Sequence, residues 1–140
     1  METKFNSQIC TSREQSERLL ALGLKKETAD MVWLDHAFTE DYDDWRSEPI
    51  YKDWEGWQKD GIPAWSLHRL IEMMPNNIHK YNDIADLSVS NELVQYRFYD
   101  VDYNHDVCLE HFNDGTLFDN IIDCIEWLIK EGYFPKEYLV

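Results

Sequence analysis

The residues best suited to chemistry lie in the stretch from Trp54 to Met74, where an arginine and a histidine stand close to a tryptophan. Trp65 and Arg69 are four residues apart, so a helix would place them one turn apart on the same side. An arginine against an indole makes a cation–π contact, and the same pair can stack a base and hold a phosphate. In the alternative interpretation these rings fill the core and pack the stem of Arg69. The residues predicted to bind a ligand are Trp65, His68, Arg69, Trp54, Trp57 and Arg97.

A zinc site is the second chemistry that the spacing suggests, at His105-x-x-Cys108-x-x-His111. On a regular strand, side chains alternate between the two faces, so residues three apart point to opposite sides. Cys108 would then face away from both histidines, and we predict no zinc ion here.

The acidic run from Asp100 to Asp106 has the spacing that begins a calcium loop. The glycine that such a loop needs at its sixth position is His105 here, and the glutamate needed at its twelfth is His111. These departures remove the sharp turn and the strongest ligand, so we predict a polar hairpin turn and no metal ion.

Motifs for catalysis are missing from the sequence. It contains no GxSxG, no P-loop and no GxGxxG, and no cysteine stands in an activating context. With only five glycines, a loop that cradles phosphate is not expected. We predict no catalytic residue and no cofactor, and the residues favour a non-enzymatic protein.

The net charge of −15 is the most unusual property of the whole chain. Such a field repels phosphate backbones, which supply most of the affinity for duplexes, so we predict no binding of duplex nucleic acid. Strong acidity suits a nucleic-acid mimic or a protein that docks on a basic partner, and it also serves solubility alone.

The three cysteines form no CxxC pair, and the sequence holds neither an apolar N-terminal run nor a segment of membrane-spanning length. These features predict free, mostly buried thiols and a cytoplasmic location without a membrane.

The pattern of apolar residues predicts an α+β fold in one domain over residues 1–140, with about three helices packed on a small antiparallel sheet. The first helix is expected to start at a capping box formed by Thr11 and Glu14, and the second at Pro63. The third helix is expected from Thr116 to Gly132. The expected strands are Met31–Leu34, Leu93–Tyr99 and Val107–Phe112. A connector over residues 78–90 and a long irregular aromatic and acidic segment over residues 35–61 complete the chain.

Three segments of the chain carry a resemblance to other proteins. They read NSQICTSREQSERLLALGLKKETADM, IPAWSLHRLIEMM and DNIIDCIEWLIKEGYFPKEYL. In this order they resemble a family of small acidic proteins encoded by phages and mobile elements of Bacteroides-type gut bacteria. The resemblance covers both ends and the middle of the chain. It implies a role against host defence and no particular catalytic residue.

Three functions stay open from the sequence. In the first, a homo-oligomer binds and sequesters a small, cyclic nucleotide immune signal at the predicted ligand residues. In the second, the acidic and aromatic segment from Asp35 to Asp60 docks on a host defence protein, and charge steers the association. In the third, the protein is an enzyme that processes nucleotides.

Overall fold

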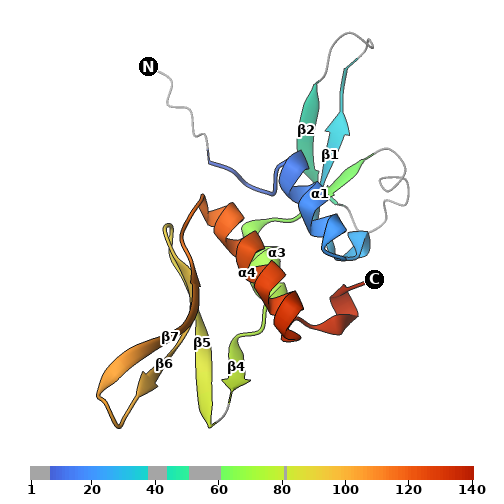
Figure 1. Cartoon of the computed structure of the whole chain (residues 1–140). Helices are drawn as coiled ribbons and strands as arrows, with labels where there is room; N and C mark the ends of the chain where they lie inside the picture. The colour runs from blue at the N-terminus through green and yellow to red at the C-terminus, as the bar shows by residue number, and fades with distance from the viewer. Residues whose placement is uncertain (1–6, 38–43, 51–60, 81) are drawn as a thin grey trace, which may run out of the picture. The chain divides into compact units, whose positions relative to one another are not determined.

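A computed structural model of the chain describes residues 7–37, 44–50, 61–80 and 82–140 (Figure 1). The chain divides into two compact units, the first ending at Arg69 and the second starting at Leu70. Each unit contains its own antiparallel sheet, which confirms the α+β class, but with two small sheets where the sequence predicts one. The assignment of residues 1–140 to a single domain stays a prediction.

Unit 1 is built on a three-stranded sheet with the order β2-β1-β3, in which both neighbouring pairs are antiparallel. The predicted strand at Met31 is confirmed as β1 (Met31–Asp35). The segment over residues 35–61, which the sequence predicts to be irregular, contains β2, one of the two strands that pair with β1. The other elements of unit 1 are α1 (Arg13–Ala21), the 3-10 helix η1 (Lys26–Thr28), β2 (Trp45–Pro49) and β3 (Ile62–Ala64).

The first helix is capped one residue later than the sequence predicts. Ser12 is the N-cap of α1, and its hydroxyl accepts from the N–H of Gln15, whose side chain accepts in return from the N–H of Ser12. Thr11 is instead fully buried, and its hydroxyl bonds to that of Ser16 over 2.8 Å. The capping-box pattern is correct in kind, but Ser12 and Gln15 fill it because Thr11 is needed inside the unit.

The start predicted for the second helix at Pro63 is wrong. Pro63 lies in β3, opposite Val32, and the helix α3 spans Leu67–Met73. Ser66 precedes this helix, and its hydroxyl accepts from the N–H of Arg69. Proline is compatible with the first turn of a helix and with the edge of a sheet, and β3 is one of the two edge strands of the described three-stranded sheet.

Unit 2 is built on a four-stranded antiparallel sheet with the order β4-β5-β6-β7. The predicted hairpin is confirmed as β6 and β7, but the predicted connector over residues 78–90 is wrong, because most of it forms β4 and β5. Its few inward side chains, such as Ile78 and Ala85, are separated by polar ones, which hides the pattern in the sequence. The elements are β4 (Asn77–Lys80), β5 (Asp83–Val89), β6 (Val94–Asp100), β7 (His105–Phe112), α4 (Leu117–Glu131) and the 3-10 helix η2 (Lys136–Tyr138).

The helix α4 forms the core of unit 2 as the sequence predicts. Thr116 caps its start, and Gly132 ends it in the left-handed conformation. Its apolar stripe is buried, and Trp127 lies against the rings of Tyr96 and Phe112 from the sheet. The β6–β7 hairpin extends away from this helix (Figure 1). Among the described residues, no helix has the length and apolar character needed to cross a membrane.

We expect Gly132→Ala to lower the free energy of unfolding by about 1–2 kcal/mol, because a side chain is unfavourable in the left-handed region. Gly132 has a φ of 79°, and a Cβ placed there would meet no atom within 4 Å, so the backbone conformation alone is responsible. Asn tolerates this region, so Gly132→Asn is the matched control and loses less. Chemical denaturation of the three proteins measures the difference, and equal losses for Ala and Asn would contradict this account.

Candidate binding surfaces

Trp65, the centre of the predicted ligand site, is a core residue of unit 1. Its side chain is fully buried, and its indole N–H donates to the hydroxyl of Thr28 over 3.0 Å. Its backbone N–H donates to the hydroxyl of Thr11, and its carbonyl accepts from the N–H of Thr11. No face of this ring is open to a ligand, so the interpretation of Trp65 as a stacking platform is corrected to that of a core residue.

The other residues predicted beside Trp65 do not form a binding wall with it in the described part of the chain. The Nε of Arg69 donates to the carbonyl oxygen of Thr28 over 2.8 Å, which ties α3 to η1. His68 is exposed on the same helix. Trp54 and Trp57 lie outside the described residues.

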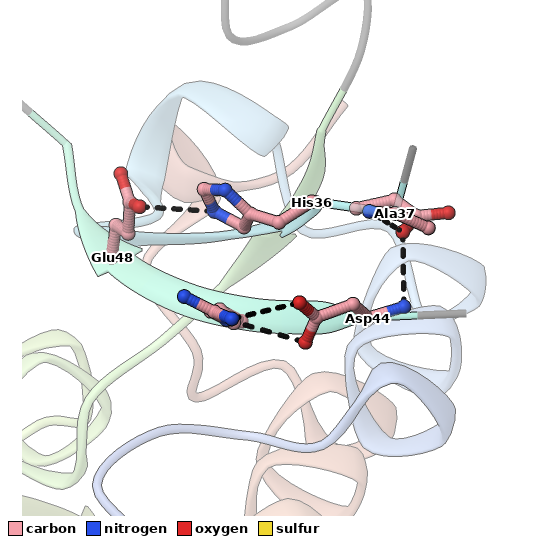
Figure 2. Close-up of polar contacts among 6 residues, drawn as sticks. His36, Ala37, Asp44 and Glu48 are labelled. Carbon is pink, nitrogen blue, oxygen red and sulfur yellow. Dashed lines mark hydrogen bonds and ion pairs between the residues drawn. The ribbon is translucent and has the colours of Figure 1, made fainter. Parts of the chain in front are cut away.

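The predicted docking segment begins at the β1–β2 hairpin, where its carboxylates have partners within unit 1 (Figure 2). Oδ1 of Asp35 accepts from the N–H groups of Ala37 and Asp44, over 2.9 and 3.1 Å. The carboxylate of Asp44 in turn accepts two bonds from the guanidinium of Arg46. The carboxylate of Asp35 thus links the end of β1 to the residue before β2, and that of Asp44 holds the side chain of Arg46.

His36 and Glu48 form the second polar pair of this hairpin (Figure 2). Nε2 of His36 lies 3.1 Å from Oε1 of Glu48, which makes an ion pair when the imidazole is protonated, although the atoms do not have the geometry of a hydrogen bond. The described carboxylates of the predicted docking segment thus have partners within the hairpin, and the charge of Asp44 is offset by Arg46.

Arg97, the last predicted ligand residue, lies on one face of the sheet of unit 2, here called the open face. Asp86 on β5 and Asp106 on β7 lie on the same face. Asp86 is the partner of Arg97 on β5, and the guanidinium of Arg97 lies 3.5 Å from the carboxylate of Asp106. The three residues, with Ser88 and Tyr99, line a shallow hollow of about 290 Å³. Because two carboxylates flank one guanidinium, the hollow suits a cationic group better than a phosphate.

Four large apolar side chains, three of them on the β6–β7 hairpin and one on the neighbouring strand β5, are exposed, and the sequence interpretation missed them. Ile84 is 50% exposed, Tyr99 54%, Val101 80% and Tyr103 76%. Acidic residues separate the three hairpin side chains along the chain, in the run Tyr99-Asp-Val-Asp-Tyr103. The sequence does carry a signal for them, because a turn in which apolar and acidic residues alternate has no core against which the apolar side chains can pack.

The turn itself is held by local hydrogen bonds. Oδ1 of Asp100 accepts from the N–H of Asp102 over 3.0 Å and from that of Tyr103 over 3.3 Å. Asn104 adopts a φ of 55°, and its side chain accepts from the hydroxyl of Tyr99. This confirms the predicted polar hairpin turn and fixes the backbone from which Val101 and Tyr103 project.

A β-bulge in β7 overturns the argument that Cys108 and His111 face opposite ways. The register shifts so that Tyr96 pairs with Glu110 while Arg97 pairs with Cys108, which leaves Leu109 as the extra residue. The extra residue restores Cys108 and His111 to one face, with Sγ 3.8 Å from Nδ1. Partial burial, and then the nearby Glu110, raise the pKa of the Cys108 thiol above its ordinary value.

The other two cysteines are free and buried, as the sequence predicts. Burial raises the pKa of the Cys124 thiol to about 12 and raises that of Cys10 as well. Among the described residues, Cys108 is therefore the thiol most open to reagents.

No protein-family model, curated protein or solved structure matches the chain. The resemblance to small acidic phage proteins therefore stays a prediction.

We expect Thr28→Val to destabilise the protein by about 1–3 kcal/mol, because it leaves the buried indole N–H of Trp65 without an acceptor. Trp65→Ala removes the whole side chain from the core and costs about 3–5 kcal/mol. Thr28→Ser keeps the hydroxyl and is the matched control, with stability close to that of the wild type. Denaturant unfolding gives all three values, and a Thr28→Val protein as stable as Thr28→Ser would show that Trp65 lacks this bond.

Asp35 gives a pH-dependent prediction. The N–H of Ala37, and then that of Asp44, hold the pKa of Asp35 below its ordinary value of 3.8. A lowered folded-state pKa stabilises the protein at pH values above 3.8, and the effect is lost as the pH falls through the folded-state value. We therefore expect the thermal midpoint of Asp35→Ala to lie below that of the wild type near neutral pH.

The gap between the two midpoints should narrow in acid, below the pKa of Asp35 in the folded protein, where its carboxyl group becomes neutral. Asp35→Asn, which keeps an acceptor oxygen but no charge, is expected to fall between the two proteins at neutral pH. Thermal scans over an acid-to-neutral series test this, and a gap that does not change with pH would refute it.

Proposed function

We propose that this chain is a non-enzymatic binding protein that docks on a basic surface of a partner protein. The docking surface, here called the hairpin surface, consists of Ile84, Tyr99, Val101 and Tyr103 with the acidic residues between and beside them. The observation that carries the proposal is that these four large apolar side chains are each half or more exposed at one end of a single sheet.

Apolar exposure of this kind has a plain physical interpretation. Single exposed apolar residues are normal on a protein surface, but a group of them rimmed by polar residues is typical of an interaction site. Tyrosine is enriched among the residues that contribute most to binding. The hydrogen bonds of Asp100 and Asn104 hold the turn in one conformation, so less entropy is lost when a partner binds.

The charge of the hairpin surface indicates the chemistry of the partner. Asp100 and Asp102 lie within the turn, and Asp86 and Asp106 flank Arg97 on the adjoining open face. A lysine or arginine of a partner would meet carboxylates here and could lie against the ring of Tyr99. The net charge of −15 would also speed the approach of a basic protein at low salt.

Nucleotide sequestration has weaker support than protein docking. Its main stacking residue, Trp65, is buried, and its candidate phosphate contact, Arg97, lies between two carboxylates. The resemblance of the sequence to phage proteins adds a host defence protein as the partner class and a homo-oligomer as the assembly.

We expect Tyr103→Ala to weaken binding of the partner by about 2 kcal/mol, or about 30-fold, as for a tyrosine at the centre of an interface. The partner is first retained from a host lysate on the immobilised full chain at low salt. Binding is then measured with the purified partner, wild type against variant, over a series of salt concentrations.

Val140→Ala is the control, because Val140 is 92% exposed and lies far along the chain from the hairpin. It should bind as the wild type does, and added salt should slow the association of both. Equal binding by the wild type and Tyr103→Ala would contradict the proposal. So would tight calorimetric binding of a cyclic nucleotide that survives Tyr103→Ala.

A further inference from the structure

Cys108 and His111 lie close together on β7, and neither residue is part of the hairpin surface. Cys108 pairs with Arg97, and His111 pairs with Gln95, so both side chains belong to the open face of the sheet. Both residues are exposed, and the bulge at Leu109 is what brings them together. The thiol and the imidazole therefore lie side by side on one strand, where both are accessible to an ion from solvent.

The separation of the two atoms matches that of two ligands on one metal ion. Zn–S bonds of about 2.3 Å and Zn–N bonds of about 2.0–2.1 Å, at a tetrahedral angle, place sulfur and nitrogen about 3.5 Å apart. In this protein Sγ of Cys108 lies 3.8 Å from Nδ1 of His111. A shift of a few tenths of an ångström would let both atoms bind the same ion.

The pair supplies only two of the four ligands that a structural zinc site needs. Within the described part of the chain, no group of three or more His, Cys, Asp or Glu side chains is placed to hold a metal ion. The remaining ligands must therefore come from outside that part of the chain. A second copy would supply the same thiol and imidazole, and the resulting Cys₂His₂ set is a common one for zinc.

We propose that Cys108 and His111 of two copies of this chain together bind one thiophilic divalent ion of the Zn²⁺ class, which links the copies into a dimer. Each thiol releases its proton to solvent when its sulfur binds the ion. β7 is an edge strand of the described four-stranded sheet, so the pair lies at the edge of that sheet. The proposal is independent of docking through the hairpin surface.

Titration of the reduced, chelator-treated full chain with Co²⁺ tests the site, because cobalt replaces zinc and reports its ligands by absorption. We expect thiolate-to-cobalt charge transfer, the strong visible bands of tetrahedral cobalt, and one ion for two chains. Zn²⁺ should displace the cobalt. Sedimentation should show the mass doubling as the metal is added.

Variants of the pair separate this site from adventitious binding. Cys108→Ser should abolish the charge-transfer band and the metal-dependent dimer. Loss of even an outer-shell partner weakens metal binding about 10–100-fold, so His111→Gln should weaken it at least about tenfold.

Two matched controls should leave the titration unchanged. His105→Gln alters a histidine of the same strand outside the pair, and Cys124→Ser removes a buried thiol. A charge-transfer band that persists in Cys108→Ser, or no band in the wild type, would overturn the site. One ion per chain without a change in mass would overturn its sharing between two copies.

Discussion

Burial of the Trp65 indole is the constraint on which the architecture of unit 1 depends. An indole in a core needs an acceptor for its N–H, and here Thr28 of η1 provides it. The backbone of Trp65 pairs in both directions with Thr11, directly before α1. One residue thereby ties the lead into α1, the 3-10 helix and the entry to α3. The arrangement also explains why Thr11 does not cap its helix, because its hydroxyl already bonds to Ser16 and to the N–H of Trp65.

The elements that the sequence predicts best are those in which local signals agree with packing. In α4 the cap at Thr116, the apolar stripe and the left-handed Gly132 all indicate the same helix, and the structure confirms each of them. The hairpin of β6 and β7 is predicted for the same reason, since Val94 and Tyr96 alternate with polar residues and are fully buried. Local agreement of this kind needs no knowledge of distant residues.

The errors arise where distant residues decide the outcome. Pro63 suits a helix start by its own chemistry, but pairing of β3 with β1 gives it another place. Trp65 lies beside Arg69 in any helical projection, and only the positions of Thr11 and Thr28 reveal that the ring points into the core. Cys108 and His111 are assigned to opposite faces by the period of a strand, and one extra residue reverses that assignment.

The β1–β2 and β6–β7 hairpins together show why acidity alone does not identify a binding site in this chain. At the β1–β2 hairpin of unit 1, Asp35 and Asp44 hold backbone and arginine groups of the same hairpin, so their charges serve the fold. At the β6–β7 hairpin, Asp100 also serves the turn, but Val101 and Tyr103 beside it have no core to enter. Carboxylates suit a docking surface where they surround apolar side chains that folding leaves in water. Burying those side chains supplies the favourable free energy of binding, and the charges select the partner.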